Sequence, residues 1–145
     1  MGKFVISLLV LLVSLDATTS VLGLPLLIRF NIEVANALQS NKGLKVYCRA
    51  KDESFPTKVL NVGSWYQMKF RVYLKTLFWC NLWQGPNFQH YAKFDAFVNN
   101  KSFVDDVCGG RNPNVCRYEA REDGVYVRDN ANGEYRLLIK WDVSP

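Results

Sequence analysis

Apolar and polar residues alternate with a period of two along most of this chain, and that pattern constrains the fold more than any other feature. Phe30, Ile32 and Val34, for example, alternate with polar residues. Successive side chains of a β-strand point to opposite faces, so this alternation predicts strands with one buried and one solvated face. Helical spacing does not recur. The expected strands are residues 28–34, 44–51, 66–72, 76–83, 91–98, 116–121, 125–127 and 135–141.

Residues that favour turns separate these runs. Gly, Asn and Asp concentrate in the intervening segments, where they supply the backbone conformations that tight turns require. The expected turns are residues 40–43, 61–63, 85–87, 99–102, 109–114, 123–124 and 129–133. Short strands at this spacing favour an all-β fold, an antiparallel β-sandwich of about eight strands. With no internal repeat and no linker, the chain is expected to form one such domain.

The N-terminus has the pattern of a signal peptide. Lys3 precedes an apolar core at Phe4–Leu15, and the polar, small stretch Asp16–Ser20 follows. This core is shorter than the roughly 20 apolar residues of a membrane-spanning helix. Cleavage after Gly23 would leave a signal peptide of residues 1–23 and a secreted domain of residues 24–145. Small residues also permit cleavage after Thr19 or Ser20, and a retained anchor is the alternative.

Length, charge and cysteine content narrow the class further. The 145 residues are too few for a multidomain enzyme, and the net charge is +5. The four cysteines (Cys48, Cys80, Cys108 and Cys116) all follow the N-terminal segment and form no CxxC pair. In an oxidising compartment an even number of cysteines predicts two disulfides, whereas zinc sites usually draw on close ligand pairs. We therefore expect two disulfides and neither metal nor cofactor.

Candidate catalytic residues are few. His90 is the only histidine, which excludes a ribonuclease that uses two histidines as acid and base. Ser102, His90 and Asp95 could form a triad only on paper, because no nucleophile-elbow motif supports it. The acidic pairs Asp105-Asp106 and Glu122-Asp123 are expected in a loop and in a hairpin turn. We expect no enzyme.

Two surface features are open to a binding interpretation. The aromatic stretch Phe78–Trp83 forms either a stacking platform for sugars or bases, or part of the core. Asn100-Lys-Ser102 is an N-glycosylation sequon in an expected turn. Basic residues are spread over outward strand positions, which is not a nucleic-acid motif: Lys69, Arg71, Arg117, Arg121, Arg128, Arg136 and Lys140.

Five segments in order resemble the plant self-incompatibility protein family, the secreted S-protein homologues. In this chain they read CRAKD from Cys48, LFWCNLW from Leu77, FDAF from Phe94, CRYEAREDGVY from Cys116 and YRLLIKW from Tyr135. His90, and Val34–Leu38 with its asparagine, are also similar to the family. Two positions depart from it: Tyr47 stands where members often have His, and Gln84 where they often have an aromatic residue. Both suit a strand face, so they bear on recognition rather than on the fold.

The resemblance implies a small extracellular signalling ligand, more firmly than it implies pollen rejection. We expect a monomer that binds a cell-surface receptor through its loops at Lys51–Lys58, Gln84–Gln89 and Gly109–Asn114. In a plant wall, acidic polysaccharide is the obvious weak counter-ion for its positive charge, and we expect no nucleic-acid partner. The alternative is a secreted defence-type carbohydrate-binding protein or a small hydrolase.

Four cysteines allow three connectivities, and the residues alone do not choose among them. In the chain-entropy model, the long closures Cys48–Cys116 and Cys80–Cys108 stabilise more than a short Cys108–Cys116 loop. They would also tie early strands to late ones. The family resemblance favours the same long closures, so we expect the pairing Cys48–Cys116 and Cys80–Cys108.

Overall fold

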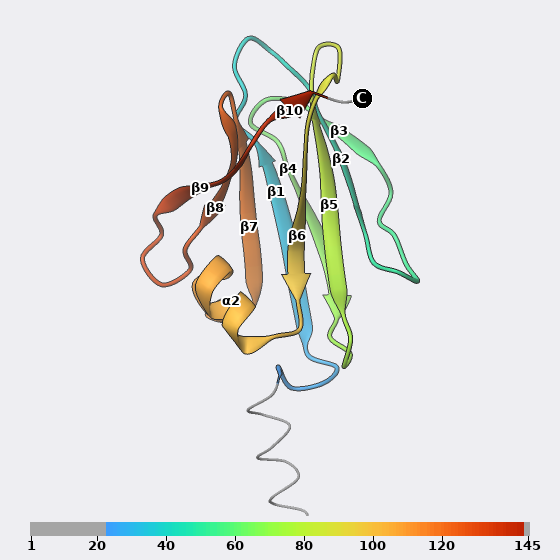
Figure 1. Cartoon of the computed structure of the whole chain (residues 1–145), viewed down its shortest axis with the longest axis vertical. Coiled ribbons are helices and arrows are strands. Elements are labelled where there is room, and N and C mark those ends of the chain that lie inside the picture. Colours follow the sequence, from blue (N-terminus) through green and yellow to red (C-terminus); the bar gives the residue numbers. More distant parts are fainter. Residues whose placement is uncertain (1–22, 144–145) are drawn as a thin grey trace, which may run out of the picture.

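Two five-stranded sheets pack face to face (Figure 1) in the computed structural model, which describes residues 23–143. The first sheet has the order β4-β1-β7-β8-β9 and the second β10-β6-β5-β2-β3. The bounds are β1 Arg29–Asn36, β2 Leu44–Arg49, β3 Lys58–Leu60, β4 Trp65–Arg71, β5 Leu77–Gln84, β6 His90–Val98, β7 Val115–Arg121, β8 Gly124–Arg128, β9 Tyr135–Lys140 and β10 Asp142–Val143. The expected signal peptide, except for its last residue, lies outside the described residues.

The alternating residues build the core between the sheets, which confirms the expected β-sandwich. Phe30 of β1 packs against Phe97 of β6 with 4.7 Å between ring centroids, and Phe70 of β4 against Phe78 of β5 with 4.5 Å. Tyr118 of β7 is buried, and its hydroxyl donates a 2.7 Å hydrogen bond to the Ala96 carbonyl of the other sheet. Burial raises the pKa of Tyr118, so this hydroxyl remains a donor. The buried polar group is thereby satisfied while it joins the two sheets.

Strand pairing differs from a purely antiparallel sandwich at one place. β1 pairs with β4 antiparallel and with β7 parallel. The structure also adds β3, at one edge of its sheet, and β10, which pairs with the start of β6. These two strands span only three and two residues, so they are too short to show a period of two. Alternation identifies strands but not their partners.

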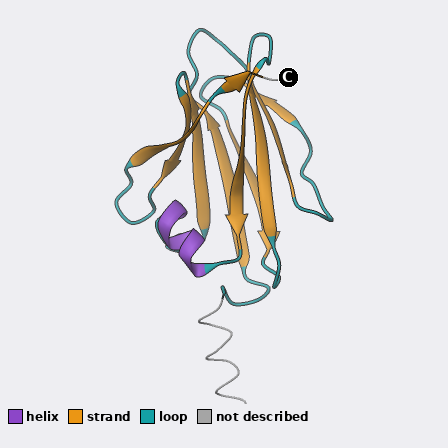
Figure 2. Ribbon diagram, viewed as in Figure 1, coloured by secondary structure: helices purple, strands orange, loops and turns teal. Residues whose placement is uncertain are grey.

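A helix, α2 (Lys101–Cys108), replaces the turn expected at residues 99–102 (Figure 2). Asn100 caps it, because its side-chain oxygen accepts the backbone N–H of Ser102 at 2.7 Å and of Phe103 at 3.3 Å. Gly109 ends it with φ 77°, a conformation that glycine adopts without strain. Asp105 and Asp106 therefore lie on a helix, not in a loop. No helix of the described residues is long and apolar enough to cross a membrane.

The disulfide pairing expected from the sequence is wrong. Cys48 bonds Cys80, and Cys108 bonds Cys116. Cys48 and Cys80 lie directly opposite each other on neighbouring strands β2 and β5, with 4.0 Å between Cα atoms. Cys108 ends α2, which contacts the start of β7. A long closure removes more entropy from the unfolded chain and would stabilise the fold more, but strand register and helix docking decide which sulfur atoms meet.

Candidate recognition surfaces

Loops gather at the two ends of the sandwich, and we name these ends by what they carry (Figure 1). β1 and β7 run parallel, so Asn36 and Arg121 finish at one end, together with β10; we call this the β10 end. The opposite end carries α2; we call it the helix end. The β10 end comprises residues 37–43, 61–64, 85–89 and 122–123, and the helix end comprises residues 23–28, 50–57, 72–76, 99–114 and 129–134.

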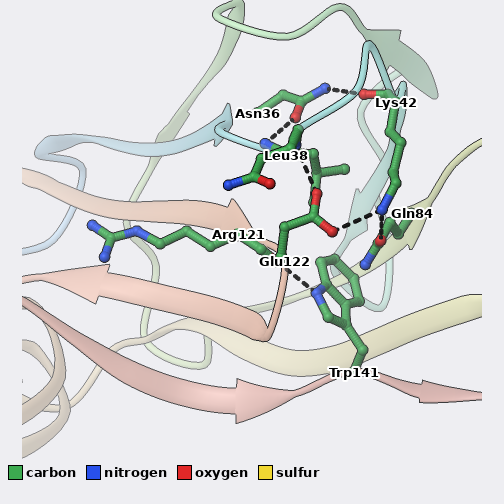
Figure 3. A network of polar contacts seen from close by, with 8 residues as sticks. Asn36, Leu38, Lys42, Gln84, Arg121, Glu122 and Trp141 are labelled. Atoms are coloured by element: carbon green, nitrogen blue, oxygen red, sulfur yellow. Dashed lines mark hydrogen bonds and ion pairs between the residues drawn. The ribbon is translucent and has the colours of Figure 1, made fainter.

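Asn36 organises the loops of the β10 end (Figure 3). Its side chain is only 2% exposed and continues the buried series of β1, where an alternating pattern would normally place an apolar residue. The amide nitrogen donates to the carbonyls of Lys42 and Leu60, both at 2.9 Å. The amide oxygen accepts the N–H of Leu38 at 2.9 Å. One side chain therefore links β1, the 37–43 loop and β3.

Lys42 and Glu122 extend this network across the two sheets (Figure 3). The Lys42 ammonium lies 2.7 Å from Glu122 Oε2 and 3.1 Å from Gln84 Oε1. Glu122 Oε1 also accepts the N–H of Gln39 at 2.7 Å. Nearby, the Trp141 indole donates to the carbonyl of Arg121 at 2.7 Å, where the chain crosses towards β10. These contacts hold the 37–43 loop and the 122–123 turn together.

Acid should weaken the Lys42–Glu122 contact. Hydrogen bonds from Lys42 and then from the Gln39 backbone lower the pKa of Glu122. A lowered folded pKa gives stability that is present above the unfolded value of about 4.3 and is lost as the pH falls through the folded value. We expect Glu122→Gln to be slightly less stable than the unchanged protein at pH 7. The difference in Tm, measured by calorimetry from pH 7 to pH 2, should vanish at the acid end. A difference that persists at pH 2 would contradict this role.

The helix end holds the larger pocket. Its volume is about 660 Å³, compared with about 210 Å³ for a pocket at the β10 end beside Gln84–Asn87. The β2–β3 loop lines it at Ala50–Glu53, and the chain from β4 into the start of β5 lines it at Tyr73 and Lys75–Leu77. Trp79 of β5 forms another wall. Aromatic and charged groups thus meet in one concave site, a common arrangement for binding.

Exposed apolar side chains lie at the same end. Leu26, Leu27, Tyr73 and Leu74 are each 45% exposed or more, and Leu74 reaches 75%. Leu27 N–H donates to the Val72 carbonyl at 2.6 Å and so joins their two segments. The Asn99 side chain also bridges these segments, because its Oδ1 accepts the Leu24 N–H at 2.9 Å and its amide nitrogen donates to the Tyr73 carbonyl at 2.8 Å. We call these four residues the helix-end apolar patch. The residue pattern gives no sign of this patch, because the 72–76 segment has no turn motif and Leu26 and Leu27 adjoin the signal-like segment.

The three loops expected to bind a receptor do not share one end. Lys51–Lys58 and Gly109–Asn114 belong to the helix end, whereas Gln84–Gln89 belongs to the β10 end. Only the first of them borders the larger pocket.

The structure does not bring Ser102, His90 and Asp95 together as a catalytic triad. His90 and Ser102 lie at opposite ends of β6, which is nine residues long, or about 27 Å. The two acidic pairs have structural roles. Asp105 pairs with Lys101 at 3.3 Å, and Glu122-Asp123 forms the expected β7–β8 hairpin turn. Among residues 23–143, no cluster of three or more His, Cys, Asp or Glu side chains is placed to hold a metal ion.

The aromatic residues of β5 lie partly in the core and partly on the surface. Phe78 is buried in the core, whereas Trp79 and Trp83 are half-buried on the outer face of their sheet. The outward basic residues of the sequence analysis are all at least partly exposed. One of them, Arg121, stacks its guanidinium over the rings of Tyr126 and Tyr135, at 4.2 and 4.9 Å from their centroids.

Comparison with known proteins places these features in a family. The sequence model of the plant self-incompatibility protein S1 family matches residues 31–141. S-protein homolog 17 of Arabidopsis thaliana is 34% identical over 110 residues, which covers 72% of this chain and 73% of that protein. S-protein homolog 74 of the same plant is 31% identical over 134 residues, covering 87% and 80%.

A solved structure agrees with the fold. It belongs to the self-incompatibility protein homologues, described as a widespread family of small, highly stable, secreted proteins from plants. The match has a TM-score of 0.57 at 20% identity and covers 79% of this chain and 96% of the other. The chain therefore belongs to the plant self-incompatibility protein S1 family and is a small, disulfide-bonded, secreted protein of the extracellular space.

Proposed function

We propose that this protein is an extracellular signalling ligand that binds a cell-surface receptor protein through its helix end. The observation that carries the proposal is the helix-end apolar patch beside the 660 Å³ pocket. Contiguous exposed apolar side chains mark interaction sites on soluble proteins, and Tyr is enriched among the residues that dominate binding energy. We further propose that the protein acts as a monomer and by binding rather than by catalysis.

The pocket would receive a side chain of the receptor, and the patch would pack against its surface. Lys51, Asp52 and Glu53 at the pocket rim add charges that select a partner. The two disulfides support this use, because they hold the neighbouring strands and α2 in place before binding. A prearranged surface loses less conformational entropy on association.

Binding of labelled protein to plant membrane vesicles tests this proposal. We expect saturable binding that trypsin treatment of the vesicles abolishes. Tyr73→Ser and Leu74→Ser should each weaken binding at least tenfold, since they remove apolar contacts at the centre of the interface. Val62→Ser is the matched control, because Val62 is an exposed apolar residue of the β10 end at 43% exposure.

Unchanged Tm values must accompany the loss of binding, because these side chains lie outside the core. The proposal fails if Val62→Ser weakens binding as much as Leu74→Ser does. It fails equally if trypsin leaves the binding intact, or if purified protein turns over a glycan or RNA substrate and loses that activity in His90→Ala.

We also propose that residues 1–23 are removed as a signal peptide. The position of Leu24 supports cleavage before it: its side chain is only 3% exposed, and its backbone nitrogen donates to Asn99 Oδ1 at 2.9 Å. A later cut would remove this buried anchor from the domain. The intact mass of the secreted protein should correspond to a start at Leu24, and a start at Leu26 or beyond would refute this proposal.

Glycosylation of Asn100 is proposed on the basis of its exposure at the start of α2. Its Oδ1 atom serves the helix cap, while an N-linked sugar attaches to Nδ2. Ser102→Ala removes the sequon but keeps the cap, because the cap uses the backbone N–H of residue 102. If Asn100 carries a sugar, the mass of the secreted variant falls by the mass of the glycan as well as by the serine-to-alanine difference. A fall by the serine-to-alanine difference alone would show that Asn100 carries no sugar.

A further inference from the structure

The outer face of the sheet β10-β6-β5-β2-β3 carries rings and cations in an ordered array. Strand register places Lys45 opposite Trp83 and Trp83 opposite Tyr91 in one row. Tyr47, Asn81 and Lys93 form the next row, and Arg49, Trp79 and Asp95 the third. We call these residues, apart from Asp95, the outer aromatic face: Lys45, Tyr47, Arg49, Trp79, Asn81, Trp83, Tyr91 and Lys93.

Each tryptophan of this face has a cation beside it. The Lys45 ammonium lies 4.9 Å from the ring centroid of Trp83. The Arg49 guanidinium and the Lys93 ammonium lie 5.6 and 5.9 Å from the ring centroid of Trp79. These distances are those of cation–π contacts, which hold a charged group next to a ring without neutralising it.

Acidic groups lie only at the margin of the face. Asp95 is in register with Trp79, on the side away from Arg49, and Asp142 is in register with Tyr91 on the short edge strand β10. The middle row contains the cation Lys93 and the amide of Asn81, and Lys45 lies in the first row on the side away from Asp142. The centre of the face is therefore positively charged and able to donate hydrogen bonds.

We propose that the outer aromatic face binds an anionic polysaccharide built of uronic acid units. The apolar C–H face of a pyranose ring packs against an aromatic ring, and the uronate carboxylate pairs with a neighbouring cation. Trp79 and Trp83 are four residues apart on one strand, about 13 Å, so they meet different sugar units of one chain. An open sheet face accepts an internal stretch of a polymer rather than a chain end.

Single-stranded nucleic acid also binds faces that combine rings with cations. The extracellular location favours the polysaccharide, because the protein is secreted and its net charge of +5 draws it to the polyanions around it. The glycan site lies on a sheet face and the receptor surface at the helix end. Either proposal can therefore fail without the other, although Trp79 also borders the pocket.

Titration of the protein with polygalacturonate fragments at low ionic strength, followed by calorimetry, tests the ring contacts. We expect saturable binding, weakened at least tenfold by Trp83→Ala and by Trp79→Ala and largely restored by Trp83→Phe. Trp65→Ala is the control, since Trp65 is a 59% exposed tryptophan of β4 on the other sheet. It should change the affinity less than twofold.

A second pair of variants separates a built site from general charge attraction. Lys45→Gln/Lys93→Gln and Lys69→Gln/Lys140→Gln each remove two positive charges, but only the first pair belongs to the outer aromatic face. We expect the first to weaken binding at least tenfold and to reduce its salt dependence, and the second to weaken it about twofold. Methyl-esterified polygalacturonate, which lacks the carboxylate charges, should bind far less tightly than the free acid.

Three results would overturn the inference. Equal losses in the two lysine pairs would show attraction to net charge alone. Retention of full affinity by both tryptophan variants would remove the rings from the site. Tighter binding of a single-stranded RNA oligomer than of polygalacturonate, with the same variant profile, would make the face a nucleic-acid site. Variants are compared only where Tm shows them folded.

Discussion

Non-reducing peptide maps of the secreted protein are expected to contain one peptide pair that joins Cys48 to Cys80 and another that joins Cys108 to Cys116. All four cysteines are fully buried. In the chain-entropy model, the 32-residue closure stabilises by about 3.5–4 kcal/mol and the 8-residue closure by about 2.5 kcal/mol. Cys48→Ala/Cys80→Ala should therefore lower the free energy of unfolding more than Cys108→Ala/Cys116→Ala does.

Urea unfolding of both double variants measures this difference. A peptide that joins Cys48 to Cys116 would refute the pairing. If Cys108→Ala/Cys116→Ala were the less stable variant, the docking of α2 against β7 would outweigh loop closure. Closure length would then not be the dominant cause of the stability difference.

Replacement of Asn36 by Ala is the point substitution with the largest expected effect. It leaves the Leu38 N–H and the carbonyls of Lys42 and Leu60 without their partner. Buried polar groups that lose a hydrogen bond each cost about 1–3 kcal/mol, with less than full additivity. We expect a loss of about 3 kcal/mol and a fall in Tm of roughly 10–15 °C.

Thermal unfolding followed by circular dichroism gives the values. Asn87→Ala is the control, because Asn87 is an exposed asparagine of a loop at the same end, and it should lower Tm only slightly. Asn36→Asp keeps the acceptor for Leu38 but loses both donors, so it should remain strongly destabilised. A small effect of Asn36→Ala would mean that water replaces the amide, and the network would not organise this end.

The architecture was largely predictable from the sequence because alternation reports burial directly. Phe30, Ile32 and Val34 face the core as their spacing requires. The same alternation could have identified Asn36 as a buried polar residue, since position 36 follows 30, 32 and 34 at every second residue. Helix α2 was also detectable: an asparagine cap precedes apolar residues at Phe103, Val104 and Val107, and a glycine ends the segment. In eight residues, however, that pattern competes with a turn.

Partners and surfaces were not predictable in this way. Alternation does not state that β1 joins β7 in parallel or that Cys48 faces Cys80, because both depend on long-range register. The helix-end apolar patch arises only when residues 26–27 and 73–74, distant in the chain, meet. For β5 the residue pattern left open whether its rings stack on a ligand or fill the core. Phe78 fills the core, whereas Trp79 lies on the opposite, outer face, where we propose a ligand site.

Photo-crosslinking on living plant cells tests whether the protein recognises a receptor through its helix end. A photoreactive side chain replaces Leu74 in one protein and Val62 in a second, so that the two probes lie at opposite ends. We expect the probe at position 74 to capture a discrete membrane protein and excess unlabelled ligand to prevent that capture. The probe at position 62 should capture little. Equal capture from both positions, or capture from position 62 alone, would contradict it.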